Sequence, residues 1–307
     1  MLYIVMEDIT TKVIVDDETS PITLDATELD LFDMMQSSKS KKTHGVYMGQ
    51  YKKLVATLGG DFKDFSKEVI ADKVASITSA NSRNLMLMIC IFLSQMYGDK
   101  IGSDFFAKIR STEKSTILKQ TKVKNKEIKE NLPELEDLEG YLFKLDNENR
   151  TQEYIINWLI FNYFVRNKDL DVKFVKTLGE AKNYEQNYIV LLRDKIKFIR
   201  NVYKTVHKHK PQTHDIKNVH FRRHCLNFFR ENKDKDKEKD VFLLNNHGTE
   251  SIGSEVQRLT YKQLGEGKLF KMAVNHHRNN IDMIKIMSQT RGTGIDCLLE
   301  NYDIENQ

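Results

Sequence analysis

Residues 188–203 read YIVLLRDKIKFIRNVY and decide the fold of the second half of this 307-residue chain. Two runs rich in β-branched and aromatic residues, Tyr188 to Leu192 and Lys197 to Tyr203, stand on either side of four residues that begin at Arg193. Such a pair of runs predicts an antiparallel hairpin with Lys195 in its turn.

Helical periodicity dominates the sequence around this hairpin. An apolar helix is predicted from Glu153 to Val165, and residues 268–301 predict two or three helices with breaks at Asn279-Asn280 and at the glycines 292 and 294. Upstream, the spacing of Tyr47, Tyr51, Leu54 and Leu58 is also helical. The predicted fold class is therefore mainly α with a small β-hairpin or sheet, an α+β protein.

The chain divides into four parts by composition. Residues 1–25 alternate β-branched and acidic residues and predict an N-terminal arm; Thr27 can cap the first helix of a helical domain over 26–110. Lysines crowd residues 111–132, where large apolar residues are scarce, and predict a basic interdomain linker. The second domain takes residues 133–307 and includes 232–240, NKDKDKEKD, which predicts a solvated loop.

Composition indicates an intracellular protein from a reducing compartment. The three cysteines Cys90, Cys225 and Cys297 are widely spaced and odd in number, which suits neither a disulfide framework nor a zinc site. The amino terminus makes a poor signal peptide, and no apolar run is long enough to span a bilayer. We expect no metal, no other cofactor and no membrane partner.

Charge is distributed unevenly, although the net charge is only +4. The region from Arg193 to Arg230 is rich in lysine, arginine and histidine, with few acids between them, which is typical of a phosphate-binding surface. A solvated basic face explains the same charges equally well. The candidate DNA-binding residues are Arg193, Lys197, Arg200, Arg222 and Arg223, with Lys122 and Lys124 in the linker.

A second motif precedes the hairpin. Residues 161–175 read FNYFVRNKDLDVKFV, so that Arg166 follows an apolar helix and is itself followed by Asp169 and Leu170. The order of apolar helix, arginine, hairpin lysine and a tyrosine near the carboxyl end resembles the tyrosine recombinase, or phage integrase, family. The resemblance covers residues 133–307, and the helical first half is similar to that family's core-binding domain.

The resemblance implies roles for individual residues. Tyr302 takes the position of the nucleophile, Arg166 that of the first phosphate-binding arginine and Lys195 that of the general acid; Arg200 matches a later arginine of the hairpin motif. The family's His-x-x-Arg box has no match, because Gly267 and Phe270 occupy its places. Lys268 or Lys271 remains as a substitute for the second arginine, and Thr290 or Arg291 is nearest to the later histidine position.

Residues 220–224, HFRRH, match that box more closely than anything downstream. They follow Lys195 by only one short segment, whereas the family's fold needs a helix and a strand or loop before the box. We therefore interpret them as a basic helix face and not as the box.

The resemblance implies a clamp of two domains around double-stranded DNA, as a homodimer or homotetramer, and strand cleavage through a 3′-phosphotyrosine without a cofactor. Divergent integrases of mobile elements or large DNA viruses are the nearest type, which would place the protein in the nucleus or cytoplasm of a host cell. The alternative is a DNA-binding or nucleoprotein-organising protein that kept the recombinase fold and lost catalysis. A more distant alternative, an all-helical viral packaging protein, is disfavoured by the hairpin.

Overall fold

A computed structural model describes residues 4–5, 12–13, 22–23, 41–203, 206, 210–235 and 239–303. The chain divides into two units, Met1–Val123 and Lys124–Gln307. Their boundary falls inside the predicted basic linker. The predicted first helix, with Thr27 as its cap, lies outside the described residues.

In the described residues of the first unit, three two-residue strands, β1 (Ile4–Val5), β2 (Lys12–Val13) and β3 (Ile22–Thr23), pair antiparallel, and helices follow them. Its helices are α2 (Lys41–Leu58), η1 (Phe62–Asp64), α3 (Lys67–Ala75), α4 (Ala80–Met96) and α5 (Lys100–Glu130). The predicted helical spacing of the α2 residues is confirmed, because they face a core shared with Ile89 and Leu93 of α4. Gly59, at φ +78°, ends α2.

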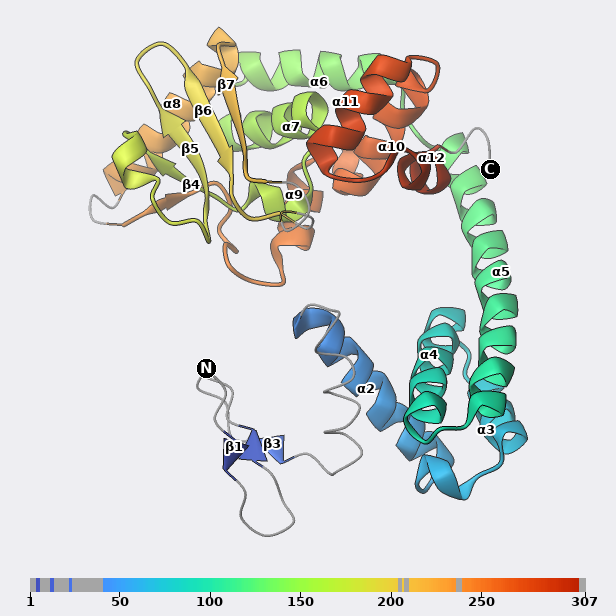
Figure 1. Cartoon of the computed structure of the whole chain (residues 1–307). Coiled ribbons are helices and arrows are strands. Elements are labelled where there is room, and N and C mark those ends of the chain that lie inside the picture. Colours follow the sequence, from blue (N-terminus) through green and yellow to red (C-terminus); the bar gives the residue numbers. More distant parts are fainter. Residues whose placement is uncertain are drawn as a thin grey trace. The chain divides into compact units, whose positions relative to one another are not determined.

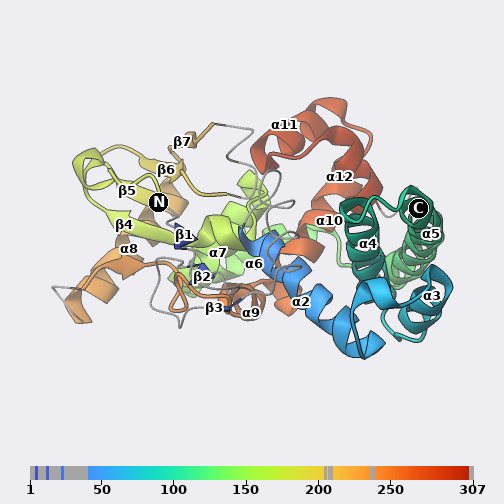
Figure 2. The ribbon, with the colours of Figure 1, turned by 60° about the horizontal axis from the view of Figure 1, so that its bottom comes forward.

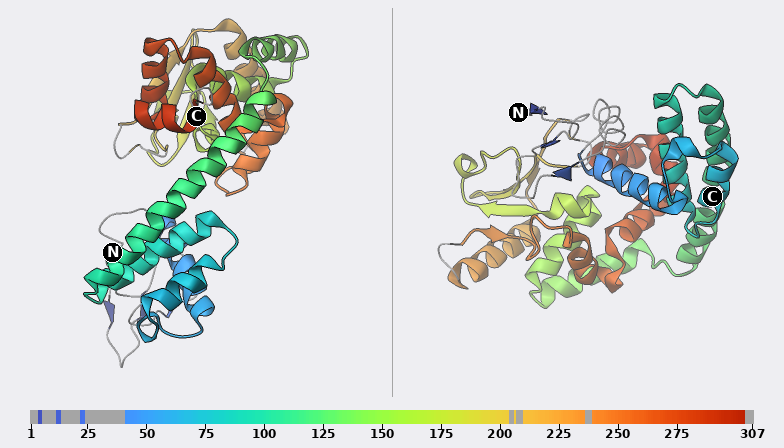
Figure 3. Two further views of the ribbon diagram at one scale, coloured as in Figure 1. Left: turned by 90° about the vertical axis from the view of Figure 1, so that its right-hand side faces the viewer. Right: turned by 90° about the horizontal axis from the view of Figure 1, so that it is seen from below.

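The lysine-rich linker forms regular secondary structure, which the composition did not lead us to expect. Residues 111–130 belong to the single 31-residue helix α5, which Figure 3 shows as one continuous rod. Lysine has a good helix propensity, and no proline interrupts this stretch. The boundary between the two units therefore falls within a helix.

The second unit places a mixed sheet beside a group of helices. Its elements are α6 (Leu135–Asn147), α7 (Thr151–Tyr163), η2 (Asn167–Leu170), β4 (Val172–Val175), η3 (Leu178–Glu180), β5 (Asn187–Leu191), β6 (Ile196–Arg200), β7 (Gln212–Ile216), α8 (Val219–Lys235), β8 (Val241–Phe242), α9 (Ile252–Leu259), η4 (Tyr261–Gln263), α10 (Gly265–His277), α11 (Ile281–Arg291) and α12 (Ile295–Tyr302). The α+β class is thereby confirmed.

The predicted hairpin is confirmed as β5 and β6, which pair antiparallel with Leu191 opposite Ile196. The sheet order is β7-β6-β5-β4-β8, and β4 and β5 run parallel. This arrangement brings the start of β4, the start of β5 and the end of β6 to one edge, next to η2. The predicted loop over residues 232–240 is partly wrong, because α8 continues to Lys235.

The helix α7 is buried through most of its length and separates two apolar cores (Figures 1 and 2). On the sheet side its residues pack with α6, α8 and the strands. On the other side lie α10, α11 and α12, around Phe164, Phe270 and Met287. The predicted breaks between these last helices are confirmed, with Asn280 capping α11 and Gly292 ending it. No helix among the described residues is long and apolar enough to cross a membrane.

Candidate phosphate-binding site

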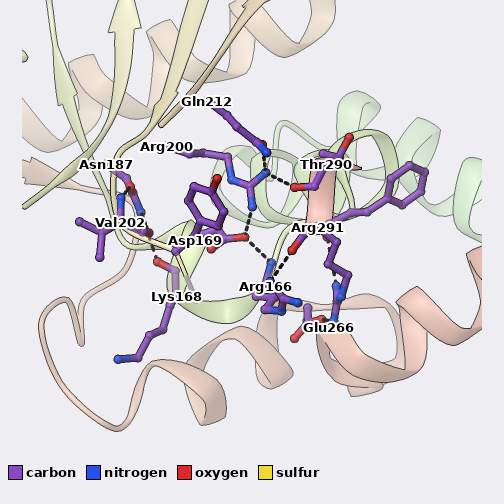
Figure 4. Close-up of polar contacts among 12 residues, drawn as sticks. Arg166, Lys168, Asp169, Asn187, Arg200, Val202, Gln212, Glu266, Thr290 and Arg291 are labelled. Atoms are coloured by element: carbon purple, nitrogen blue, oxygen red, sulfur yellow. Dashed lines mark hydrogen bonds and ion pairs between the residues drawn. The ribbon is translucent and has the colours of Figure 1, made fainter. Parts of the chain in front are cut away.

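Three arginines from different elements meet where α7, the sheet edge and the end of α11 come together (Figure 4). Arg166 follows α7, Arg200 ends β6 and Arg291 ends α11. We call Arg166, Arg200, Arg291 and Tyr302 the arginine–tyrosine cluster. Its members come from sequence positions up to 136 residues apart, as the numbering of Arg166 and Tyr302 gives.

Within the cluster, Arg291 is the arginine that contacts Tyr302. Its side chain is only 2% exposed, and its Nη2 donates to the hydroxyl of Tyr302 at 3.4 Å. The same nitrogen donates to the carboxylate of Glu266, and Nη1 donates to the carbonyl of Phe164 at 3.0 Å. Since a guanidinium only donates, the tyrosine hydroxyl accepts in this contact and its own proton stays available to another group.

Phe270 contacts both Arg291 and Tyr302. The Arg291 guanidinium lies over the Phe270 ring at 3.8 Å from its centroid, and the Tyr302 ring meets Phe270 edge-on at 4.8 Å. Sequence comparison with the recombinase motif put Phe270 where the family has its second arginine. In the folded chain, a guanidinium from α11 therefore covers the ring of that very residue.

Arg166 is partly buried and contacts the carboxyl end of α11. Its Nη1 donates to the carbonyl of Arg291 at 2.5 Å. Burial, together with the neighbouring charge of Arg291, lowers the pKa of Arg166 from its ordinary value. Within the described part of the chain its guanidinium forms no ion pair with a carboxylate. A bound anion would therefore stabilise the charged form of Arg166.

Arg200 is buried within the cluster. Its side chain is fully buried, and its Nη2 forms an ion pair of 2.5 Å with Asp169, which is also fully buried. The Asp169 carboxylate accepts in addition from the backbone nitrogen of Arg166 at 2.9 Å. A side chain without exposed surface does not contact a DNA phosphate, so the burial of Arg200 does not support its assignment as a DNA-binding residue.

Removal of one partner of the buried Asp169–Arg200 pair should destabilise the fold strongly. Asp169→Ala leaves the Arg200 charge buried without its partner, which costs about 3–5 kcal/mol in the free energy of unfolding. Asp194→Ala, at the exposed hairpin turn, is the matched control and should change it by less than about 0.5 kcal/mol. Urea denaturation measures both. A loss below about 1 kcal/mol for Asp169→Ala would show that the pair is dispensable.

Lys195 lies away from the cluster. It precedes β6, whereas Arg200 ends it, and five residues of strand span about 16 Å. Its Nζ pairs with Asp215 of β7 at 2.6 Å, and this hydrogen bond raises the pKa of Lys195, which makes it a weaker proton donor. The placement does not support the predicted role of Lys195 as general acid beside Arg166 and Tyr302.

Neither proposed substitute for the second arginine joins the cluster. Lys268 is exposed and lies two positions after Glu266, which puts it on a different face of α10 from the Arg291 contact. Lys271 donates to the side chain of Asn125 near the end of α5, and burial lowers its pKa. Arg291, which the resemblance places near the later histidine position, is instead the arginine that contacts the Tyr302 hydroxyl.

The other predicted DNA-binding residues fall into three groups. Lys197 shares Asp215 with Lys195, at 3.0 Å, and Arg222 donates to the carbonyl of Arg193 at 2.5 Å, so this group surrounds the hairpin turn. Lys122 and Lys124 are exposed on α5. Arg223 forms the third group, with the HFRRH segment.

The HFRRH segment serves helix packing. His220 and His224 contact the carboxylate of Asp146 on α6 at 2.9 and 2.7 Å, and Arg223 pairs with the same carboxylate. His224 is fully buried and stacks on Tyr154. Asp146 thus pairs with three side chains of α8, and the segment ties α8 to α6.

Two signals in the sequence could have indicated Arg291. It is the only basic residue after Lys285, and it continues the buried positions Ile284 and Met287 of α11 at helical spacing. An arginine in an apolar register needs a buried partner. The partners Glu266 and Phe164 are distant in sequence, so their identity was not predictable.

Comparison of this chain with protein-family models, with curated proteins and with solved structures finds no match in any of the three.

Proposed function

We propose that this protein binds double-stranded DNA through the phosphate backbone and cleaves one strand with Tyr302 as the nucleophile. The observation that carries the proposal is the contact between Arg291 and the Tyr302 hydroxyl, at 3.4 Å, beside Arg166. Two guanidinium groups next to a tyrosine hydroxyl are suited to a phosphodiester: the guanidinium donors match its non-bridging oxygens, and the tyrosine can attack its phosphorus.

The two arginines contribute differently to this proposed chemistry. Arg166 is partly exposed and lacks a carboxylate partner among the described residues, so it is the group that would hold the phosphate. Arg291 is buried and acts on the tyrosine, whose hydroxyl it orients. Charge that builds up on the phosphate oxygens during attack would be stabilised by both guanidiniums without a metal.

The proposed step balances without a cofactor. The Tyr302 oxygen forms a bond to phosphorus, the bond from phosphorus to the 5′ oxygen breaks, and the protein is left on a 3′ phosphate. The proton that the tyrosine loses equals the one that the 5′ hydroxyl gains. Rejoining is the same exchange in reverse.

A second candidate function is DNA binding without cleavage. It is favoured by the position of Lys195 at the other end of β6 and by the pairing of Arg291 with Glu266. Both leave the cluster with fewer free cations than the resemblance implies.

A nicked duplex separates these two functions. A randomised pool of duplexes with nicks should include substrates from which the short cleaved fragment diffuses away, so that rejoining fails. The wild-type protein is expected to form a protein–DNA complex that survives denaturing electrophoresis. Salt-sensitive binding without such a complex would establish the second function and exclude the first.

Binding itself should depend steeply on salt. A protein that makes six to ten phosphate contacts loses about 10³–10⁵-fold in affinity between 50 and 200 mM salt. The double substitution of Lys122 and Lys124 by Ala should lower the slope of log K against log salt by about 1.8, that is about 0.9 for each lysine. Fluorescence anisotropy with a labelled duplex measures the slope. An affinity indifferent to salt would contradict both candidate functions.

A further inference from the structure

The carboxyl end of α11 has every free carbonyl occupied. The last four carbonyls of a helix have no partner within it. Here the acceptor groups and their donors are Ser288 with the backbone of Thr293 (3.0 Å), Gln289 with the backbone of Gly292 (3.1 Å) and with Gln212 Nε2 (3.1 Å), Thr290 with Arg200 Nη1 (2.6 Å), and Arg291 with Arg166 Nη1 (2.5 Å).

Side chains from three other elements therefore hold three consecutive carbonyls of one helix end. Figure 4 shows Gln212, Arg200 and Arg166 arranged along it. Gly292, at φ +62°, already ends α11 with its own backbone contacts, so the helix does not need these side chains to stop. Two guanidiniums at the negative end of a helix dipole are favourable, and they fix α11 to the sheet edge.

Gln212 and Arg200 act as a pair. Gln212 Oε1 accepts from Arg200 Nη1 at 2.7 Å, and Gln212 Nε2 donates to Gln289. The Gln212 side-chain amide therefore bonds to both neighbours: its oxygen accepts from the Arg200 guanidinium, and its nitrogen donates to the Gln289 carbonyl.

The helix end leads directly to the tyrosine. Only residues 292–294 separate α11 from α12, which ends at Tyr302. The backbone carbonyl of Tyr302 is held by Asn275 of α10 at 3.0 Å. The tyrosine segment is thus fixed at its beginning through α11 and at its end through Asn275.

We propose that Gln212 and Arg200 are positioning residues that set the Tyr302 hydroxyl against Arg291 by clamping the carboxyl end of α11 to the sheet. The inference that this matters for strand cleavage rests on the proposed function. The clamp itself is a property of the fold, and it can be measured without any DNA.

Gln212→Glu tests the clamp most directly. The carboxylate still accepts from Arg200, so the buried Asp169–Arg200 pair keeps its surroundings, but an oxygen now faces the Gln289 carbonyl and repels it. Arg200 itself is a poor first choice, because its removal leaves Asp169 buried and unpaired. Thr213→Ala is the matched control, since Thr213 is the next residue on β7 and is exposed.

Hydrogen exchange is the readout that a merely structural role would not move selectively. In Gln212→Glu, amides of residues 295–303 are expected to exchange about tenfold faster, while those of α7 and the urea midpoint stay unchanged. On nicked duplexes, the trapping rate at saturating DNA should fall about tenfold or more, because small displacements of a nucleophile are costly, with the half-saturating concentration unchanged. Thr213→Ala should match the wild type in all four measurements.

The outcomes separate the clamp from the chemistry. Unchanged exchange in residues 295–303 overturns the clamp, and so does faster exchange spread evenly over α7 and α12. Selectively faster exchange in a protein whose wild type traps no DNA supports the clamp and overturns strand cleavage. Selectively faster exchange with an unchanged trapping rate overturns the link from clamp to catalysis.

Discussion

Tyr302→Phe is expected to abolish covalent trapping on nicked duplexes and to leave duplex binding within about twofold of the wild type. The substitution removes the phenol oxygen, which is the atom of Tyr302 that would bond to phosphorus. It keeps the ring, and with it the edge-on contact with Phe270, so the core around α12 should stay packed. Denaturing electrophoresis of the trapped complex measures the first effect, and anisotropy measures the second.

Tyr261→Phe is the control for this experiment, because Tyr261 is the next tyrosine that could be considered as nucleophile. Its ring packs against Tyr141, with 5.0 Å between centroids, and it belongs to η4, outside the arginine–tyrosine cluster. The control should trap DNA like the wild type. Trapping that survives in Tyr302→Phe and disappears in Tyr261→Phe would reassign the nucleophile.

Local patterns predicted much of the fold. Apolar spacing indicated α2 and α7, and the polar breaks at Asn279-Asn280 and Gly292 divided the last helices correctly. The hairpin followed from two β-rich runs around a charged turn. These features depend on neighbours within a few residues, which a sequence displays directly.

The linker and the site depended on information that local patterns lack. High lysine content is compatible with both a solvated linker and a helix, and α5 is a helix. The burial of Arg200 follows from its pairing with Asp169, 31 residues earlier in the chain. Which end of the hairpin meets α7 depends on the parallel pairing of β4 with β5, and no motif specifies it. That pairing brings Arg200 to the cluster and leaves Lys195 outside.

Arg166→Ala should reduce the rate of covalent trapping by about 10²–10³-fold, which is typical for the loss of one preorganised donor to a developing charge. The fold should survive, because among the described residues the guanidinium makes one hydrogen bond, to the Arg291 carbonyl, whose loss costs about 1.5–3 kcal/mol. Arg166→Lys keeps the charge and loses the paired donors, so its trapping rate should lie between those of the wild type and Arg166→Ala.

Arg110→Ala is the matched control for Arg166→Ala. Its Nε donates to the carbonyl of Asn84 at 3.4 Å, so the substitution also removes a guanidinium-to-carbonyl contact, but in the first unit. Single-turnover trapping should be unchanged in Arg110→Ala, and urea denaturation should show a smaller loss of stability than in Arg166→Ala. If Arg166→Ala unfolds the protein, the arginine is primarily a structural tie between α7 and α11. If it folds and still traps DNA at the wild-type rate, the phosphate is held elsewhere, and the cations around the hairpin turn become the groups to substitute next.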